Sequence, residues 1–384
     1  MKILLIVNTD GALFIFRKPL ISYLKKSNHD VESISGRSDF FHRLIELGVG
    51  VHELDFSRHS VSLLQNLRLL FSLKYLIQKI SPDIVHNFTH KPSIYGSLAA
   101  RLAGVKRIFV TITGLGTLFI HDDLKSRILR EILVIQYRLA LRFVNTVFFQ
   151  NPDDLSYFLQ RRIVLPKQVL LTNGSGIDLD EIGSYSEERR IRARATLAAE
   201  LEKNIGLRQV VLFPARAMRE KGYYEYYEAA KILSSRYPSR FVFLHLGWVE
   251  SSLKGGVSKD TILAYAQQHG VCYLGFKDNI SEYMLASDII VLPSYREGTP
   301  RSLIEALALG RVIVTTNVPG CRETVVDGWN GYLCEPKSAK SLASKIEMVD
   351  QDFSTLAINR SRKLCEDKYD VNKLIKITAE RYGI

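Results

Sequence analysis

The feature that most constrains the fold is a repeated alternation of short, largely apolar runs with segments of helical periodicity. Runs such as KILLIV at 2–7, DIVHNF at 83–88 and RIFVTIT at 107–113 are each followed by a longer segment of helical pattern. Continuous runs rich in Val and Ile are typical of strands that are buried on both faces. The alternation therefore predicts βαβ units around a parallel sheet.

The alternation stops once and then restarts. The segment LTNGSGIDLDEI at 171–182 is polar and contains two glycines, and the strand-like runs resume with QVVLFPAR at 209–216. We therefore predict an N-terminal domain at 1–172, a C-terminal domain at 173–365 and a C-terminal helix at 366–384. Two doubly wound halves of similar size predict an α/β protein with a binding cleft between Rossmann-like domains.

Composition excludes several classes of protein. The 384 residues are 46% hydrophobic, which is sufficient for sizeable cores. We expect neither a membrane span nor an export signal, because charges interrupt the apolar stretches and the N-terminus reads as a first strand. The four cysteines are widely spaced and form no CxxC pair, so we expect neither a disulfide framework nor a zinc site.

The charge of the chain is uneven. The net charge is +12, and residues 1–180 hold 23 Lys and Arg against 15 Asp and Glu, so that +8 of the excess lies in the first half. A basic half suits nucleic acid, an anionic membrane surface or a substrate that carries phosphate, and charge alone leaves all three open.

The segment REGTPRSLIEALALG at 296–310 predicts a strand, a loop and a helix N-terminus in series. The preceding SDIIVLPS reads as a buried strand, and Glu297 falls in the loop. We expect Thr299 to be the N-cap, Pro300 to take the first helical position and Gly310 to end the helix. Such a loop can hold an anion.

The segment FPARAMREKGYYE at 213–225 also joins a buried strand to a helix, which we expect to begin near Gly222. Its loop contains Arg216, a fork for phosphate oxygens, and Lys221, a point charge. These residues predict a site for a diphosphate, and taken alone they are read equally well as surface charges beside a turn.

The order and spacing of four residues, Arg216, Lys221, Glu297 and Glu305, together with YLGFKDNI at 273–280, resemble the retaining glycosyltransferases of family 4, which have the GT-B fold. The resemblance covers essentially the whole chain. It includes the opening turn at 10–12, the NGSGID linker and the GWNGYLCEP segment after the second glutamate.

The resemblance implies a nucleotide-sugar donor and a set of roles. Glu305 would accept hydrogen bonds from the ribose, Glu297 would face the transferred sugar, and Arg216 and Lys221 would neutralise the leaving diphosphate. His90, preferred to His86, would help to orient the donor sugar and the acceptor as a catalytic residue. The remaining donor-binding residues implied are Gly11, Phe276, Ile280, Gly298, Thr299, Pro300 and Arg301.

The mechanism implied is front-face displacement, in which an oxygen of the diphosphate helps to deprotonate the acceptor. No cofactor and no metal are expected, since no Asp-x-Asp motif stands at a suitable strand end. The chain departs from the family at Gly11, where many members have paired glycines, and at Gly247-Trp248, where a second glycine often follows. These departures bear on the donor sugar and on the approach of the diphosphate.

Residues 124–143, LKSRILREILVIQYRLALRF, combine apolar and basic residues. The pattern fits a basic amphipathic helix on an anionic membrane and fits core packing equally well. The neighbouring loop GLGTLFIHDD at 114–123 would insert beside it. The residues that we expect to contact the acceptor or the membrane are Lys91, Arg127, Arg130 and Arg138.

At finer scale, FSRHSVS, THKPSIYG, TITGLGTLF, PARAMREKG and LPSYREGTPRSLIEA are similar to bacterial α-1,3-N-acetylgalactosaminyltransferases that extend sugars linked to undecaprenyl diphosphate. This similarity implies a UDP-sugar donor, UDP-GalNAc or a related hexose. It also implies a lipid-linked diphosphate saccharide as acceptor, in O-antigen, capsule or N-glycan assembly. The enzyme would be cytoplasmic and peripheral on the inner face of the bacterial cytoplasmic membrane. The anionic lipids there would attract its basic half.

Three other functions compete with this one. The first is that of a GT-B glycosyltransferase with a different donor or acceptor. A UDP-sugar 2-epimerase would bind the donor in the same cleft, but such enzymes lack the pair of glutamates eight positions apart. A protein that binds nucleic acid is suggested by charge alone, and we expect no such partner. The basic residues are dispersed among apolar helices, without an aromatic-rich basic motif.

Overall fold

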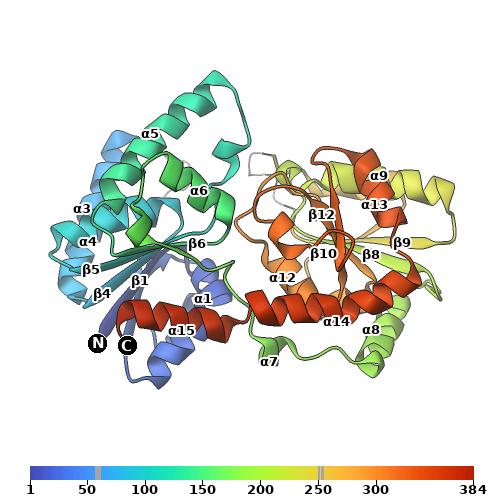
Figure 1. Cartoon of the computed structure of the whole chain (residues 1–384), viewed down its shortest axis with the longest axis horizontal. Helices are drawn as coiled ribbons and strands as arrows, with labels where there is room; N and C mark the ends of the chain where they lie inside the picture. Colours follow the sequence, from blue (N-terminus) through green and yellow to red (C-terminus); the bar gives the residue numbers. More distant parts are fainter. Residues whose placement is uncertain (57–61, 250, 252–254) are drawn as a thin grey trace. The chain divides into compact units, whose positions relative to one another are not determined.

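The computed structural model describes residues 1–56, 62–249, 251 and 255–384, so most of the FSRHSVS motif, at 57–61, lies outside the described residues. The chain forms two compact units (Figure 1). The N-terminal unit consists of Met1–Gly176 together with Val371–Ile384, and the C-terminal unit is Ile177–Asp370.

A seven-stranded parallel sheet forms the centre of the N-terminal unit. Its strands lie in the order β3-β2-β1-β4-β5-β6-β7. The strands are β1 (Lys2–Thr9), β2 (Asp30–Gly36), β3 (Gly50–Glu53), β4 (Ile84–Phe88), β5 (Arg107–Ile112), β6 (Thr146–Phe149) and β7 (Val169–Leu171). The middle strands are almost fully buried, as expected for apolar runs covered on both faces.

Helices cover both faces of this sheet. One core joins the sheet to α3 (Leu63–Ile80), η1 (Pro92–Gly96), α4 (Ser97–Leu102), α5 (Leu124–Leu141) and α6 (Pro152–Gln160). The core on the opposite face is formed with α1 (Asp10–Lys26), α2 (Phe41–Glu46) and α15 (Val371–Tyr382). Two short 3-10 turns, η2 (Thr117–Phe119) and η3 (Pro166–Gln168), complete the unit.

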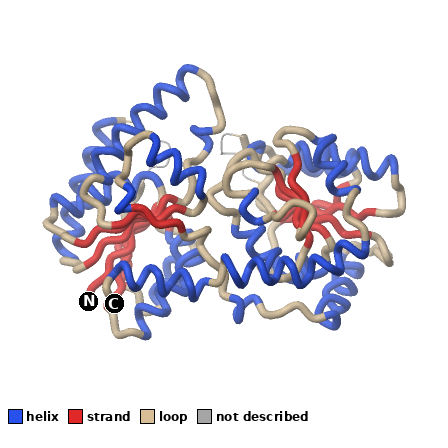
Figure 2. The backbone as a smooth tube through the Cα atoms, viewed as in Figure 1, coloured by secondary structure: helices blue, strands red, loops and turns tan. Residues whose placement is uncertain are grey.

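The C-terminal unit repeats this architecture with six parallel strands in the order β10-β9-β8-β11-β12-β13 (Figure 2). They are β8 (Gln209–Pro214), β9 (Phe241–Leu246), β10 (Val271–Gly275), β11 (Ile289–Leu292), β12 (Val312–Thr316) and β13 (Gly331–Cys334). Its helices are α7 (Leu179–Ile182), α8 (Glu187–Glu200), α9 (Tyr223–Arg236), α10 (Lys259–His269), α11 (Ile280–Ala286), α12 (Arg301–Ala308), α13 (Ala339–Glu347) and α14 (Gln351–Lys368), with 3-10 turns η4 (Arg219–Lys221) and η5 (Arg322–Thr324). The predicted pair of parallel α/β sheets is confirmed.

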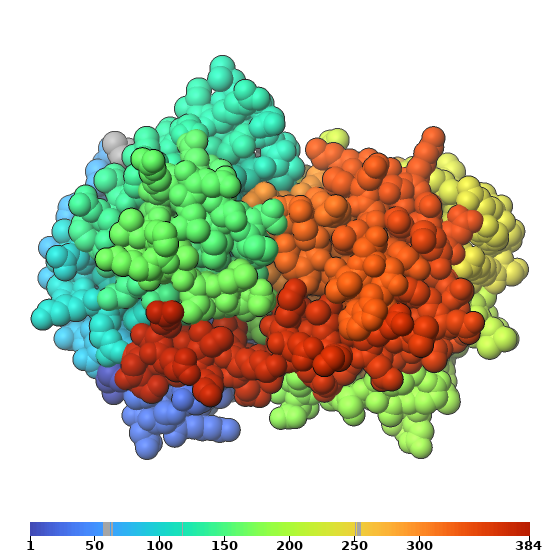
Figure 3. All heavy atoms as spheres, viewed as in Figure 1, coloured from blue at the N-terminus to red at the C-terminus, as the bar shows by residue number. Residues whose placement is uncertain are grey.

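The C-terminal helix belongs to the N-terminal unit. The chain leaves that unit after Gly176 and returns at Val371. The helix α15 forms most of the segment predicted as a terminal helix at 366–384, and only residues 366–368 belong to the end of α14. On α15, Tyr382 is fully buried, and its hydroxyl lies 2.5 Å from Nδ1 of His86 on β4. The helix lies beside α1 on the surface of the unit (Figure 3).

Three local predictions were wrong. Thr299 is not the N-cap, because its hydroxyl donates to the Gly298 carbonyl and α12 begins after Pro300 instead. The segment CRETVVDG at 321–328, which follows the strand-like VIVTTN and was expected to be the next helix of the alternation, has only the 3-10 turn η5. The Asn330 amide holds the chain in a turn there by accepting from the Val326 amide and donating to the Thr324 carbonyl. The segment at 10–12 is the first turn of α1, which begins directly after β1.

Candidate functional site

The strand order places the predicted loops of the C-terminal unit side by side. From β8 the chain continues to β9 and β10 on one side, whereas β11, β12 and β13 lie on the other. The order therefore reverses between β8 and β11, which are neighbours in the sheet. Loops at the carboxyl ends of two such strands diverge and leave room for a ligand, so Arg216, Lys221 and Glu297 share the favoured position.

Lys221 and Glu297 form an ion pair across this reversal point. The ammonium contacts Oε1 of the carboxylate, and the Ser294 hydroxyl donates to the same oxygen at 2.8 Å. The Lys221 side chain is 26% exposed and that of Glu297 13% exposed, so the attraction between the charges is only partly screened by water. The pair fixes a cation and an anion at known positions above the sheet.

Glu305 lies on the first turns of α12, and its side chain is 17% exposed. Its Oε1 accepts from Nε of Arg301, four residues earlier, at 2.7 Å. The Arg301 guanidinium therefore sits over the beginning of α12, where the helix dipole is positive. Gly310 ends the helix with a φ of +67°, as predicted.

Three glycines allow the backbones of these loops to pack directly on one another. A Cβ on Gly222 would lie 2.1 Å from the Pro293 carbonyl oxygen, and one on Gly247 would lie 2.0 Å from that of Ala215. A Cβ on Gly320 would lie 2.5 Å from the Glu297 carbonyl oxygen, and the Glu297 amide donates to the Pro319 carbonyl at 3.0 Å. The loops that carry Arg216, Lys221 and Glu297 are thus supported by backbone contacts that admit no side chain.

Trp248 and Cys321 lie beside these loops and were not predicted as part of a site. Trp248, which follows β9, stacks on Phe276, which follows β10, with ring centroids 4.2 Å apart, although both rings are about half exposed. Such an exposed aromatic pair offers a flat surface to a ligand ring. Cys321 is fully buried, and burial and the nearby Glu297 carboxylate raise the pKa of its thiol. The sequence held one signal for these two residues: Trp248 is aromatic and directly follows Gly247, where the chain departs from the family pattern.

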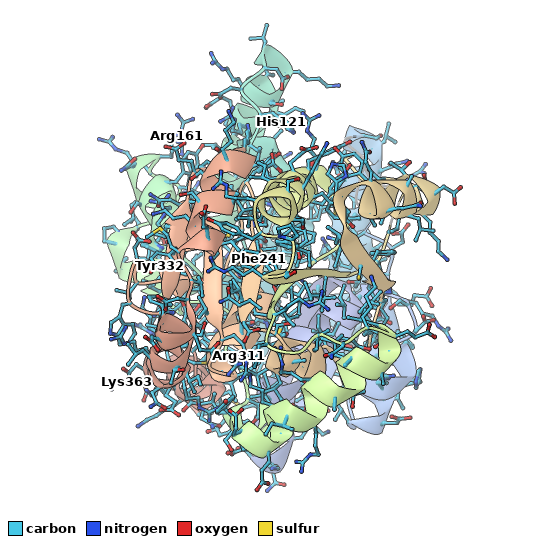
Figure 4. All side chains as sticks on the ribbon, turned by 90° about the vertical axis from the view of Figure 1, so that its right-hand side faces the viewer. His121, Arg161, Phe241, Arg311, Tyr332 and Lys363 are labelled. Atoms are coloured by element: carbon cyan, nitrogen blue, oxygen red, sulfur yellow. The ribbon has the colours of Figure 1, made fainter. Side chains whose placement is uncertain are left out.

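The C-terminal unit also carries the other residues that the resemblance implied. Gly298, Thr299 and Pro300 lie between Glu297 and α12, and Ile280 is the first residue of α11. Figure 4 shows the side chains of this unit, with Phe241 at the start of β9, Arg311 before β12 and Tyr332 on β13.

The N-terminal unit has a second reversal point, between β1 and β4. Gly11 follows β1, and a Cβ there would lie 3.0 Å from the Phe40 ring, so this glycine makes room for a side chain of its own unit. The preceding Asp10 is fully buried and accepts from the Ser38 amide at 2.7 Å. His90 follows β4 after Thr89, which has a φ of +69°.

His90 is partly buried, and its Nδ1 lies 2.6 Å from the Tyr137 hydroxyl. Desolvation lowers the pKa of His90, and a backbone hydrogen bond with Leu115 offsets part of this effect. The ring is therefore neutral at pH 7. His86, by contrast, is buried within β4 between Tyr382 and Thr111, and the choice of His90 over His86 for a site stays a prediction.

The four residues predicted to contact the acceptor or the membrane differ in their surroundings. Burial lowers the pKa of Lys91, and Asp55 partly restores it. On α5, Arg130 donates to the Asp122 carboxylate and the His121 carbonyl, and Arg138 donates to the Arg161 carbonyl. Arg127 is largely exposed.

The loop at 114–123 differs from its prediction. Leu118, Phe119 and Ile120 are partly buried, and Phe119 packs edge-on against Tyr157 at 5.3 Å, so these side chains belong to the unit rather than to an exposed tip. Within the described residues, no three His, Cys, Asp or Glu side chains are grouped so that they could hold a metal ion.

Two family models match the chain in succession. Residues 2–151 match the model for glycosyl transferase 4-like domains, and residues 200–358 match that for glycosyl transferases group 1. The first match includes the strands β1 to β6 of the N-terminal sheet, and the second includes all six strands of the C-terminal sheet.

Individual proteins extend over more of the chain. An N,N'-diacetylbacillosaminyl-diphospho-undecaprenol α-1,3-N-acetylgalactosaminyltransferase of Campylobacter jejuni is 29% identical, covering 100% of this chain and 97% of the relative. A UDP-Gal:α-D-GlcNAc-diphosphoundecaprenol α-1,3-galactosyltransferase of Escherichia coli is 26% identical over 80% of this chain and 76% of its own. The crystal structure of Anabaena HepE in complex with UDP superposes with a TM-score of 0.78 at 19% identity, covering 100% of both chains. This likeness shows the fold, and the predicted GT-B architecture is confirmed.

Proposed function

Since the chain belongs to the glycosyl transferases, with a 4-like domain followed by a group 1 domain, we propose that it transfers a sugar from a UDP-sugar to a saccharide carried on undecaprenyl diphosphate. The sugar is GalNAc or a related hexose, the linkage is α-1,3, and the product enters the assembly of a bacterial surface glycan. The activities for which the Campylobacter and Escherichia relatives are named support this proposal.

The observation that carries the proposal is the Lys221–Glu297 pair at the reversal point of the C-terminal sheet, with Glu305 on the following helix. A nucleoside diphosphate needs cations for its phosphates and acceptors for its ribose hydroxyls. Lys221 and Arg216 offer the cations, and the Glu305 carboxylate is an acceptor held in place by Arg301. The backbone at 298–301 and the positive end of α12 favour the diphosphate.

In the proposed reaction, the bond between the sugar C1 and the diphosphate oxygen breaks while a new bond forms from the acceptor hydroxyl on the same face. The acceptor proton passes to an oxygen of the departing diphosphate, which leaves as UDP. Because the acceptor attacks on the face from which the diphosphate leaves, the configuration at C1 is retained. Lys221 and Arg216 stabilise the charge that grows on the diphosphate, in place of a metal ion. Glu297 orients the sugar ring, and neutral His90 hydrogen-bonds to the sugar or the acceptor.

The acceptor brings the enzyme to an anionic membrane. No helix among the described residues has the length and apolarity needed to cross one. We place the protein peripherally on the inner face of the bacterial cytoplasmic membrane, with α5 as its contact. Five side chains of α5 support this placement because they form an exposed apolar stripe along the helix, namely Leu124, Ile128, Ile132, Ile135 and Leu139.

The test is transfer from a panel of radiolabelled UDP-sugars to a short-chain, water-soluble polyprenyl-diphosphate saccharide, with EDTA present. We expect one UDP-sugar to serve as donor and the product to retain the α configuration. Transfer that requires added divalent metal would overturn the metal-free mechanism, and a β-linked product would overturn retention. If no UDP-sugar serves with any polyprenyl-diphosphate acceptor, the proposed substrates are wrong.

A further inference from the structure

The outward side of α3 is apolar, although α3 already buries its opposite side in the core. Leu69, Leu73, Ile77 and Ile80 are buried against the sheet. Leu64, Phe71 and Tyr75 are separated by seven and four residues, which places them on one side of a helix. They are 67%, 60% and 66% exposed, and Leu67 beside them is 45% exposed.

Single exposed apolar residues are normal, but a contiguous stripe marks a surface that meets another apolar phase. Water-facing helices of a globular unit carry polar residues at these positions. On α3 the outermost positions hold the largest apolar side chains instead. Packing within the N-terminal unit does not account for them, because the same helix contributes a separate buried face.

This side of α3 belongs to the same layer as the stripe on α5. Both helices pack on one face of the N-terminal sheet, and α4 contacts both of them. At the end of α4, Leu102 is 55% exposed, and Arg101 stacks over the Phe143 ring just beyond α5 at 5.5 Å. Since the outward sides of helices in one layer turn away from the same sheet, both stripes face the same side of the unit.

The charged side chains of α3 and α5 indicate what kind of surface these stripes contact. Residues 63–80 contain Arg68, Lys74 and Lys79 and no Asp or Glu, and residues 124–141 contain four basic residues against the single Glu131. Glu131 is itself paired with Arg161. Apolar side chains flanked by ammonium and guanidinium groups match the boundary between acyl chains and anionic headgroups. Two copies of this face would instead bring like charges together.

We infer that α3 is a second membrane-contact helix and that it forms, with α5, a two-helix surface that inserts into the interface of an anionic bilayer. The inference rests on the proposed function, which brings the enzyme to a lipid-linked acceptor, and adds an element that neither the charge pattern nor the relatives assign. Leu64, Phe71 and Tyr75 enter the acyl boundary, while Arg68 and Lys79, both exposed, contact headgroup phosphates.

Tryptophan substitutions measure the depth of α3 directly. Both native tryptophans, Trp248 and Trp329, lie in the C-terminal unit, so the wild-type spectrum can be subtracted from that of Phe71→Trp. Ile132→Trp serves as the probe on α5. Leu356→Trp is the matched control, because Leu356 is 54% exposed on a helix of the C-terminal unit.

Each probe is mixed with phosphatidylcholine vesicles with or without phosphatidylglycerol, and quenching by brominated acyl chains is recorded. We expect the emission of Phe71→Trp and Ile132→Trp to shift to the blue and be quenched only when phosphatidylglycerol is present, and that of Leu356→Trp to stay unchanged. Phe71→Glu combined with Tyr75→Glu should lower the partition coefficient at least about tenfold, because apolar contacts are lost and like charges are added. Circular dichroism checks that the variant keeps its helix content.

Other results would overturn the inference. Quenching at Ile132→Trp without quenching at Phe71→Trp would leave α5 as the membrane contact and exclude α3. A dimer in the absence of vesicles that Phe71→Glu dissociates would assign the face to a second copy of the chain. Absence of vesicle binding would exclude the surface altogether. Transfer to the water-soluble acceptor needs no vesicle. Whether this transfer occurs therefore tests the proposed reaction independently of the membrane contact.

Discussion

Lys221 and Glu297, which are 76 positions apart in the sequence, form a partly buried ion pair above two neighbouring strands of the C-terminal sheet. Each side chain sits on a loop fixed by a glycine contact, Gly222 against Pro293 and Gly320 against Glu297. The pair therefore positions its charges before any ligand is bound. Preorganised charges stabilise a transition state without the cost of reorganising the site.

Replacing Lys221 with Met should lower kcat by about 100-fold or more, because a positioned charge on the leaving diphosphate is lost. The measurement is transfer at saturating donor. Lys363→Met is the matched control, since Lys363 also forms an ion pair, with Asp367 at 3.3 Å, on the exposed side of α14 in the same unit. Equal rates for wild type and Lys221→Met would remove Lys221 from the reaction.

Glu305→Gln should weaken UDP binding about 10-fold to 100-fold, because a charged acceptor for the ribose hydroxyls becomes neutral. Calorimetric titration with UDP measures this effect without any sugar transfer. Glu366→Gln removes a comparable carboxylate, one that accepts from Arg362 four residues earlier at 2.8 Å, and should leave UDP affinity unchanged. Unchanged affinity in Glu305→Gln would place the ribose elsewhere.

Gly320→Ala should lower transfer at least about tenfold, because the new Cβ would lie 2.5 Å from the Glu297 carbonyl oxygen and displace the loop. Gly328→Ala separates this contact from backbone strain. Gly328 has a similar φ of +73°, against +85° for Gly320, but nothing lies within 4 Å of its Cβ position. Loss of stability in both variants with loss of transfer only in Gly320→Ala is expected. Equal loss of transfer in both would assign the effect to strain.

The C-terminal unit should lose stability as the pH falls from 7 to 5. Burial lowers the pKa of His245 to about 4, so the unfolded chain binds a proton below about pH 6.5 that the folded chain does not. Stability therefore rises with pH across this window. Over these two pH units, wild type should lose about 2 kcal/mol more than His245→Gln does.

Tryptophan fluorescence during urea unfolding follows this unit, because Trp248 and Trp329 both lie in it. The comparison uses the slope of stability against pH, so a constant cost of the substitution does not affect it. His245 also supports the loop that begins the site, since its Nε2 lies 2.9 Å from the Ala215 carbonyl. Parallel slopes for wild type and variant would show that His245 does not carry the pH dependence.

The basic residues of α5 should differ in what they do. Lys125→Glu with Arg127→Glu should release the protein from anionic vesicles, with at least about a tenfold loss in cosedimentation, because both side chains are exposed. Arg130→Glu with Arg138→Glu should instead lower the Tm, because these side chains bond Asp122 and the Arg161 carbonyl. Unchanged vesicle binding in the first variant would exclude α5 as the electrostatic contact.

The sequence by itself determined the fold class and the order of the site residues. Buried parallel strands need continuous apolar runs, and these runs are local, so the βαβ alternation and the loop position of Glu297 were predicted from neighbouring residues. The helices α8 and α14 were not predicted. The residues of α14 are polar along most of its length and show no clear apolar periodicity, and the helix is held by packing on α12. The N-cap at Thr299 failed because a hydroxyl can bond to a neighbouring carbonyl as readily as to a helix amide.

Only the tertiary structure decided which residues meet. The reversal of strand order between β8 and β11 brings Lys221 to Glu297, and the return of the chain at Val371 places Tyr382 against His86, 296 positions earlier. The outward side of α3 also became visible only in three dimensions, because an apolar helix has the same sequence pattern whether one side or both are covered. Local patterns fix which elements form, whereas contacts over long sequence separations depend on how the sheets order their strands and which faces the helices leave to solvent.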